Sequence, residues 1–151
     1  MKFDDMLKMM SENWNTVDSY PRVSSKTEIR EAVQTKDGNN KTVIRADIDL
    51  KNQDLKSLSA MFPGIIDIVD GDFDCSINDL TDLKGCPRLI EGDFDCSHNP
   101  LKSLDGFPKE VHGMVTISSI GKSFVGAKKL SVEDITSICK VDPDQVELIE
   151  D

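Results

Sequence analysis

Paired aspartates recur along this chain and are its clearest candidates for chemistry. The hexapeptide GDFDCS occurs at residues 71–76 and again at 92–97, with carboxylates at alternate positions in each copy. A related segment, ADIDLK, occupies residues 46–51. Because alternate residues of a β-strand point to the same face, each pair would lie on one side of a sheet. Such carboxylates could bind a basic protein surface or hold Ca²⁺ or Mg²⁺.

The other reactive residue types give little support for catalysis. The two histidines, His98 and His112, do not adjoin a Ser or Cys in a nucleophile motif, and the sequence has no GxSxG. We expect both to be surface loop histidines. The four cysteines form no CxxC, and no pair of histidines has zinc spacing, so we expect free thiols in a reducing compartment. No catalytic residue, cofactor or metal is therefore predicted. The cysteines are Cys75, Cys86, Cys96 and Cys139.

The two GDFDCS copies belong to a longer internal repeat with an offset of 21 residues. Residues 71–87 read GDFDCSINDLTDLKGCP, and residues 92–108 read GDFDCSHNPLKSLDGFP. Weaker copies flank them, with ADIDLKNQDLKSL at 46–58 and GMVTISSIG at 113–121. Strand alternation predicts that the apolar positions of every copy face one shared core. The first of these positions holds Ile48, Phe73, Phe94 and Val115.

The pattern G-D-F-D-C-S-x-N-x-L-x-x-L-x-G-x-P resembles the short leucine-rich repeats of small proteins from T4-like bacteriophages and some bacteria. The resemblance covers residues 40–121, and two copies are fully typical, since Gln53 and Ile120 replace the motif's Asn in the others. It implies a strand, a turn bonded by Asn78 or Asn99, and a return segment in each unit. It also implies a phage-encoded protein that acts in the host cytoplasm, but it specifies no activity.

From these patterns we predict a single domain of class α+β over residues 1–151. Its centre is a short leucine-rich-repeat-like solenoid sheet at residues 46–121. Stacked repeats expose apolar surface at both ends, so we expect a cap at each end. Residues 1–45 would form an N-terminal helix and hairpin cap, and residues 122–151 a C-terminal helical cap with an acidic tail.

Helical periodicity supports the first cap and helix-start signals support the second. Apolar residues of Met1–Trp14 recur at helical spacing, which predicts either a capping helix or a methionine-rich helix that binds a partner. The segment DGNN at 37–40 is a strong turn signal, followed by alternation over Thr42–Leu50. Near the C-terminus, Ser131 is a predicted N-cap, and Pro143 a predicted start of a second short helix.

The charge of the chain excludes some partners and is concentrated on the repeats. In 151 residues, 28 acidic and 18 basic side chains give a net charge of -10. This argues against binding to nucleic-acid phosphates or to an acidic membrane surface. Residues 46–116 hold 14 acidic and 6 basic residues, which is a net charge of -8. The sequence also has no run of about 20 apolar residues that would cross a membrane.

We therefore predict a non-enzymatic protein-binding module that modulates or inhibits a basic host protein, such as a defence or nucleic-acid enzyme. Three alternatives stay open. The aspartates belong to the repeat's own architecture and bond neighbouring backbone; the protein is a virion or assembly component that self-associates; or it is a metal-dependent hydrolase using these aspartates. The last lacks an EF-hand or RTX-type loop. The predicted partner-binding residues are Asp47, Asp49, Asp72, Asp74, Asp93 and Asp95.

Overall fold

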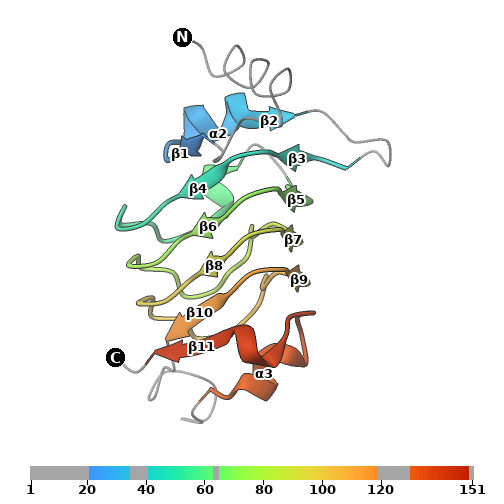
Figure 1. The fold of residues 1–151 in the computed structure, drawn as a ribbon. Coiled ribbons are helices and arrows are strands. Elements are labelled where there is room, and N and C mark those ends of the chain that lie inside the picture. Colours follow the sequence, from blue (N-terminus) through green and yellow to red (C-terminus); the bar gives the residue numbers. More distant parts are fainter. Residues whose placement is uncertain (1–20, 35–40, 63–64, 119–129, 150–151) are drawn as a thin grey trace.

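The computed structural model describes residues 21–34, 41–62, 65–118 and 130–149. Within these ranges the chain forms two sheets of short, mostly parallel strands (Figure 1). Sheet A has six strands in the order β1-β4-β6-β8-β10-β11, and sheet B has five in the order β2-β3-β5-β7-β9. From β3 to β10 the chain alternates between the sheets. We call each segment that adds one strand to each sheet a unit.

Sheet A is parallel throughout, and its register follows the sequence repeat. Ile48 pairs with Phe73, Phe73 with Phe94, and Phe94 with Val115, which confirms the alignment made from the sequence. Each of these four side chains is buried, as strand alternation predicts. The strands are β1 (Arg22–Val23), β4 (Asp47–Asp49), β6 (Phe73–Asp74), β8 (Phe94–Asp95), β10 (Val115–Ser118) and β11 (Val146–Ile149).

Sheet B as a whole was not expected from the sequence, although its pair of β2 and β3 confirms the hairpin predicted within residues 1–45. One antiparallel pair, β2 with β3, begins it, and the remaining strands are parallel. The segment Thr42–Leu50, predicted as one strand, divides into β3 and β4, which belong to different sheets. The strands are β2 (Val33–Gln34), β3 (Val43–Ile44), β5 (Ile68–Val69), β7 (Leu89–Ile90) and β9 (Glu110–Val111).

Helix is a minor component of the described residues. The α-helices are α2 (Lys26–Ala32) and α3 (Val132–Thr136), and the 3₁₀-helices are η2 (Ser59–Met61) and η4 (Pro143–Gln145). The predicted N-cap is confirmed, because Ser131 forms a capping box with Asp134. The predicted start of a second short helix at Pro143 is confirmed by η4, but its predicted continuation is wrong, because the helix ends after three residues and leads directly into β11.

The predicted fold class, an α+β domain with one leucine-rich-repeat-like solenoid sheet and helical caps, is therefore wrong. Two sheets dominate the described chain, and the part predicted as a C-terminal helical cap contributes an edge strand to sheet A. The physical reason is that sheet B strands such as Ile68–Val69 and Leu89–Ile90 consist of two adjacent apolar residues and so show no alternation of polar and apolar residues. The predicted helix at Met1–Trp14 and the turn at 37–40 lie outside the described residues.

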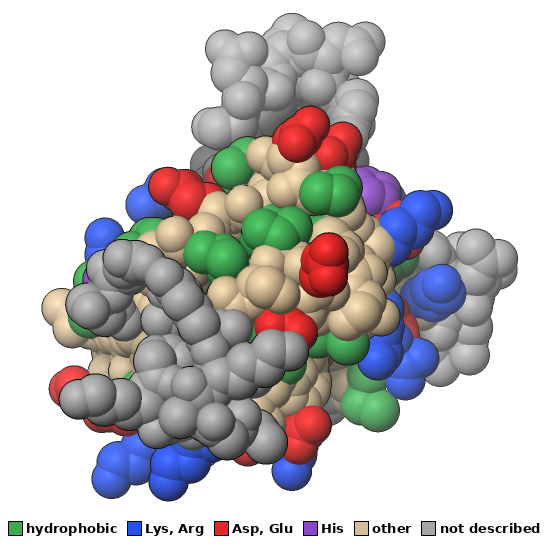
Figure 2. All heavy atoms as spheres, turned by 90° about the horizontal axis from the view of Figure 1, so that it is seen from below, with side chains coloured by type: hydrophobic (Ala, Val, Ile, Leu, Met, Phe, Trp, Pro, Cys, Tyr) green, Lys and Arg blue, Asp and Glu red, His purple; other side chains and the backbone are tan. Residues whose placement is uncertain are grey.

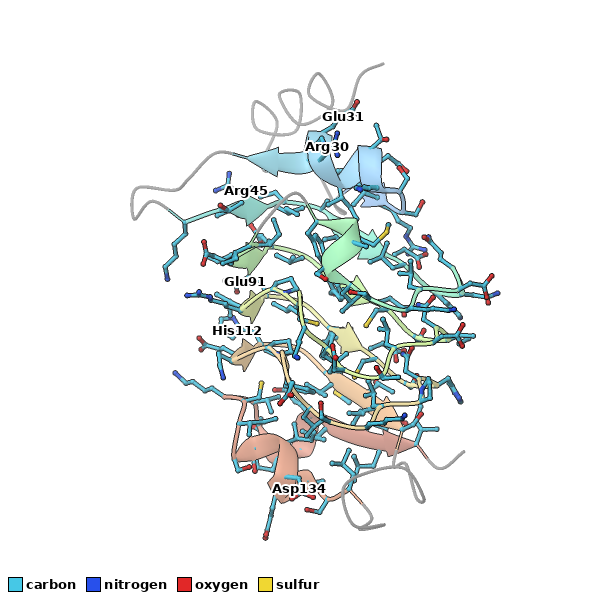
Figure 3. All side chains as sticks on the ribbon, turned by 180° about the vertical axis from the view of Figure 1, so that it is seen from behind. Arg30, Glu31, Arg45, Glu91, His112 and Asp134 are labelled. Carbon is cyan, nitrogen blue, oxygen red and sulfur yellow. The ribbon has the colours of Figure 1, made fainter. Side chains whose placement is uncertain are left out.

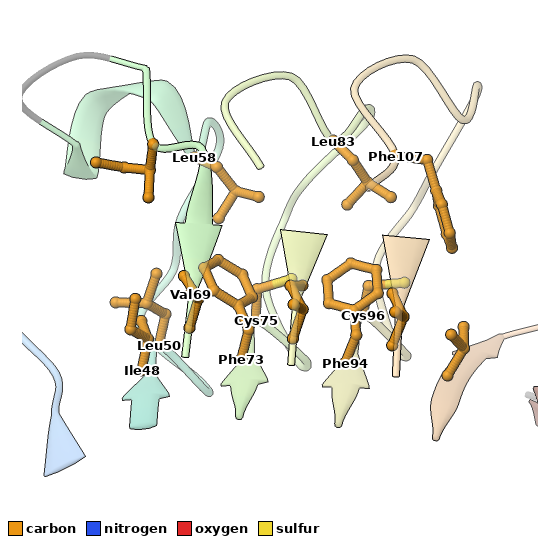
Figure 4. Close-up of a cluster of buried hydrophobic side chains, with 14 of the residues drawn as sticks. Ile48, Leu50, Leu58, Val69, Phe73, Cys75, Leu83, Phe94, Cys96 and Phe107 are labelled. Carbon is orange, nitrogen blue, oxygen red and sulfur yellow. The ribbon is translucent and has the colours of Figure 1, made fainter. Parts of the chain in front are cut away.

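Buried side chains of both sheets and of the return segments that follow β6 and β8 form one core, which is built from stacked equivalents (Figure 4). The ring centroids of Phe62 and Phe73 are 6.0 Å apart, those of Phe73 and Phe94 5.9 Å, and those of Phe94 and Phe107 5.4 Å. Such aromatic pairs contribute about 0.5–1.5 kcal/mol beyond the area they bury. Sheet B supplies Val69 and other buried side chains to the same cluster. Two of these rings, Phe73 and Phe94, belong to strands that carry the aspartates, so they pack behind the face that the aspartates occupy.

The C-terminal end of the two sheets is covered in part by α3 and β11. Viewed from that end, hydrophobic side chains are visible among acidic ones (Figure 2). Ile138 is 38% exposed, and Val146 and Leu148 are partly buried against the core. No helix among the described residues has the length and apolar character needed to cross a bilayer.

Candidate functional site

All six predicted aspartates line one open groove of about 370 Å³ on the outer face of sheet A. We call these residues the aspartate face: Asp47, Asp49, Asp72, Asp74, Asp93 and Asp95. The strand register places them in two columns that cross successive units. Column 1 consists of Asp47, Asp72 and Asp93. Column 2 consists of Asp49, Asp74 and Asp95.

The carboxylates of column 1 link each unit to the next. The Oδ1 atom of Asp47 accepts the backbone N–H of Asp72 at 2.8 Å, and Oδ1 of Asp72 accepts that of Asp93 at 2.8 Å. The series ends where Asp93 Oδ1 accepts the backbone N–H of Met114, also at 2.8 Å. These bonds support the alternative in which the aspartates serve the architecture of the repeat.

This geometry explains the glycine that precedes the first aspartate of each GDFDCS motif. A Cβ atom at Gly92 would overlap Asp72 Oδ1 and the main chain of Gly71. Only a residue without a side chain lets the carboxylate of one unit approach the backbone of the next so closely. The Gly-Asp pair is therefore one structural device.

Column 2 bonds within its own unit. Asp74 Oδ1 accepts the backbone N–H of Ser76 at 2.9 Å and its hydroxyl at 2.6 Å. Asp95 makes the same two bonds to Ser97, at 3.0 Å and 2.6 Å. These bonds hold the carboxylates in one orientation and give the N–H and hydroxyl groups of the two buried serines a hydrogen-bond acceptor. Such bonds are expected of aspartate at the start of a turn. They also explain why the motif continues Asp-Cys-Ser.

The first unit differs because it has a basic neighbour. Arg22, from β1, lies 3.3 Å from Asp49 Oδ2, and Asp49 Oδ1 also accepts the backbone N–H of Lys51 at 3.1 Å. Burial raises the pKa of Asp47 above its ordinary value; the hydrogen bond from the Asp72 backbone opposes this, and the charge of Asp72 adds to it. Among the described residues that line the groove, Arg22 is the one basic side chain.

The other two units keep unused acceptor capacity. Within the described part of the chain, no hydrogen bond or ion pair involves the Oδ2 oxygens of their four aspartates. An ionised carboxylate accepts through both oxygens, so one oxygen of each remains for a cation or a donor. These four residues are Asp72, Asp74, Asp93 and Asp95.

The aspartate face does not form a metal cage in the described residues. No group of three or more His, Cys, Asp and Glu side chains there converges in a way that could hold a metal ion. Four carboxylates distributed over two units give few shared ligand positions, whereas Ca²⁺ takes six to eight oxygen ligands around one point. The geometry favours contact with several separate cationic groups.

The cysteines occupy structural positions. Cys75 and Cys96 are fully buried, and desolvation raises the pKa of both thiols well above the ordinary value. Burial raises the pKa of Cys86 in the same way, and that of Cys139 to about 11. All four are free thiols. Because the thiolate is the reactive form, these side chains are poor nucleophiles in the folded chain.

The two histidines have different surroundings. His98 is exposed in the turn after β8 with a φ of 53°, at the position that Ile77 occupies with a φ of 55°. His112 lies between two carboxylates, with Nδ1 2.6 Å from Glu91 Oε2 and Nε2 3.1 Å from Glu110 Oε1. It is on the surface as expected, but its ion pairs were not foreseen.

The predicted asparagine role is confirmed. Asn78 and Asn99 are buried, and each donates its side-chain amide to carbonyls of its own turn and of the preceding unit. Sequence reasoning missed Arg22 and Glu147, which line opposite ends of the groove from β1 and β11. A two-residue strand leaves no signal for Arg22, whereas the alternation of Val146 and Leu148 was a usable signal for β11.

Comparisons of the chain with protein-family models, with curated proteins and with solved structures found no match. The resemblance to phage leucine-rich repeats stays a prediction. The proposals below therefore rest on the geometry and charge of the described residues.

Proposed function

We propose that this protein is a non-enzymatic binding module whose aspartate face accepts a Lys- and Arg-rich surface of a protein partner. The observation that carries the proposal is the convergence of six carboxylates on one groove, with Arg22 as the single basic side chain among its described lining residues. Complementary charge accelerates association and favours a correctly oriented complex. By the resemblance stated above, the partner would be a basic host protein met in the host cytoplasm.

The structural bonds of the aspartates are compatible with this function. Each bond to backbone or serine neutralises no charge, because N–H and O–H groups are dipoles. The carboxylates are held in fixed orientations before a partner arrives, so less side-chain entropy is lost on binding. The architecture that aligns the carboxylates thus also prepares them for recognition.

Asparagine substitutions separate the charge from the architecture. Asparagine keeps a side-chain oxygen that accepts the same backbone N–H, but it carries no charge. The test variant combines Asp72→Asn, Asp74→Asn, Asp93→Asn and Asp95→Asn. A partner would first be recovered by affinity purification from bacterial lysate, and the affinity of the purified pair would then be measured at several salt concentrations. We expect salt-sensitive binding to the natural chain and a loss of about tenfold or more in the variant.

A matched control removes four charges elsewhere. Asp54, Asp79, Asp105 and Asp144 are exposed, and none of them lines the groove. Changing all four to Asn alters the net charge equally, so we expect affinity close to that of the natural chain. Unchanged binding of the aspartate-face variant refutes the proposal, and equal losses in both variants show that net charge alone attracts the partner.

Two further measurements address the alternatives. Sedimentation that shows concentration-dependent oligomers, with no recovered partner, would favour a self-associating assembly component. Calorimetric titration with Ca²⁺ and Mg²⁺ would reveal the metal site that a hydrolase needs. We expect neither result for a binding module.

A further inference from the structure

His112 joins two strand ends of sheet B through both of its ring nitrogens. It follows β9 directly, while Glu91 follows β7, and the two lie on neighbouring units at one edge of the molecule (Figure 3). Nδ1 is 2.6 Å from Glu91 Oε2, and Nε2 is 3.1 Å from Glu110 Oε1. An ionised carboxylate can only accept, and a neutral imidazole has a single N–H. Two bonds to two carboxylates therefore require the doubly protonated ring.

We propose that His112 is a proton-dependent clasp, which ties the ends of β7 and β9 together when doubly protonated and opens when it loses one proton. This device lies on sheet B and does not depend on the aspartate face. Its geometry is already complete in the folded chain, since both carboxylates lie within hydrogen-bond distance of the ring. Loss of either N–H turns one attractive contact into a lone pair facing a carboxylate.

The charged groups around the clasp reinforce the effect of proton loss. Glu91 faces the ring from the end of β7, and Glu110 faces it from β9. The segment after α3 contributes Lys140, whose Nζ is 3.6 Å from Glu110 Oε1, and Asp142, which lines the same surface hollow as the ring. When the imidazolium becomes neutral, three carboxylates remain around one ammonium group. Repulsion among them then favours separation of the strand ends.

The direction of the pH effect follows from the same contacts. The hydrogen bonds to Glu110 and then to Glu91 raise the pKa of His112 above its ordinary value. A group whose folded pKa is raised stabilises the fold fully below its unfolded value of about 6.5, and this stabilisation is lost as pH rises through the folded value. The clasp is thus closed below the folded pKa of His112 and opens above it, at a higher pH than that at which an unperturbed imidazole loses its proton. Its side chain is 47% exposed, so solvent screening keeps the contribution of the clasp to the stability of the whole fold small.

Backbone bonds beside the ring give a local readout of opening. The N–H of His112 donates to the carbonyl of Ile90 at 3.0 Å, and that of Val111 donates to the carbonyl of Lys140 at 3.1 Å. The side chain of Gln145 lies 3.4 Å from the His112 carbonyl. Opening of the clasp would expose these amides and loosen the segment that follows α3.

The test uses the full chain labelled with ¹⁵N and a ring-nitrogen NMR titration from about pH 5 to about pH 9, the range in which histidine titrates. The His112 signals are identified by their loss in His112→Gln, and the urea-unfolded chain provides the reference midpoint. We expect a folded midpoint above the unfolded one, with both ring nitrogens protonated below that midpoint. Glu91→Gln and Glu110→Gln should each lower that midpoint, whereas Glu133→Gln, an exposed glutamate on α3, should leave it unchanged.

Two outcomes would overturn the proposal. The first is a folded midpoint at or below the unfolded one, or a midpoint that neither glutamine variant moves. The second concerns opening: amide exchange at Val111, corrected for the intrinsic pH dependence, should accelerate above the folded midpoint in the natural chain. If it accelerates equally in His112→Gln, the ring does not control the strand ends.

Discussion

Replacement of Asn78 by Asp is the sharpest test of how neighbouring units are joined. The substitution exchanges an amide NH₂ for an oxygen at nearly constant volume. In the natural chain, Oδ1 accepts the backbone N–H groups of Gln53 and Leu55, each at 3.0 Å. Nδ2 donates to three main-chain carbonyls, of which that of Leu50 is closest at 2.9 Å. A carboxylate can reproduce the first pair of bonds and none of the second set.

The expected loss of stability depends on which of the three carbonyls still have a hydrogen-bond donor after the substitution. The carbonyl of Ser76 still accepts a hydrogen bond from the backbone N–H of Asn52 at 3.1 Å. The carbonyl of Cys75 still accepts one from the side-chain amide of Asn99 at 3.1 Å. The carbonyl of Leu50 is therefore the group that loses its hydrogen-bond donor. One buried group left without its partner costs about 1–3 kcal/mol, and a charged oxygen facing carbonyls in a site that is 7% exposed adds a similar amount. We expect a decrease of about 3–5 kcal/mol in the free energy of unfolding at neutral pH.

Urea unfolding followed by circular dichroism measures this decrease. The new carboxyl is disfavoured in its charged form, so its folded pKa lies above its unfolded value. The penalty should therefore shrink as pH falls through that folded value. The reverse exchange, Asp72→Asn, keeps the acceptor that binds Asp93 and should cost less than about 1 kcal/mol. A decrease below about 1 kcal/mol for Asn78→Asp, with an unchanged m-value, would refute the reasoning.

Three further variants or reagents give independent checks. Gly92→Ala should lower the unfolding free energy by about 2 kcal/mol, because its Cβ meets the Asp72 carboxylate and backbone; an unchanged denaturation midpoint would contradict this. Ile77→Asn should raise it by about 1 kcal/mol, since a β-branched residue is strained at a φ of 55° and asparagine is not; a lower thermal midpoint would count against that view. The thiols of Cys75 and Cys96 should resist a thiol reagent in the native chain and react in urea, and rapid native labelling would show that the core opens.

Sheet A could be anticipated from the sequence because its strands carry a strong alternation. Phe73 and Cys75 are apolar and point inward, and the aspartates between and before them are polar and point outward, so the repeat by itself predicts the register of the strands. The position of the six aspartates in one groove follows from that register. Their hydrogen bonds to the next unit did not follow, because backbone direction is not visible in a pattern of side chains.

The parallel strands of sheet B and strand β11 were not predicted from the sequence, for physical reasons. A strand such as Ile68–Val69 shows no period, and a Pro at position 143 is as compatible with one 3₁₀ turn as with a longer helix. The contact between Glu91 and His112, however, could have been predicted from the sequence. Glu91 and His112 are separated by the same 21 residues that relate the two typical repeats, so the alignment already placed them side by side.

The bonds between units run in opposite directions. Aspartate oxygens of column 1 bind the unit that follows, whereas Asn78 and Asn99 bind the unit that precedes. A middle unit is thus held by side chains encoded in its neighbours as well as in itself. Selection on any one copy of the motif therefore acts through the copies beside it. Neighbouring copies are expected to diverge together, and a unit transplanted alone would lose the hydrogen bonds that its neighbours contribute.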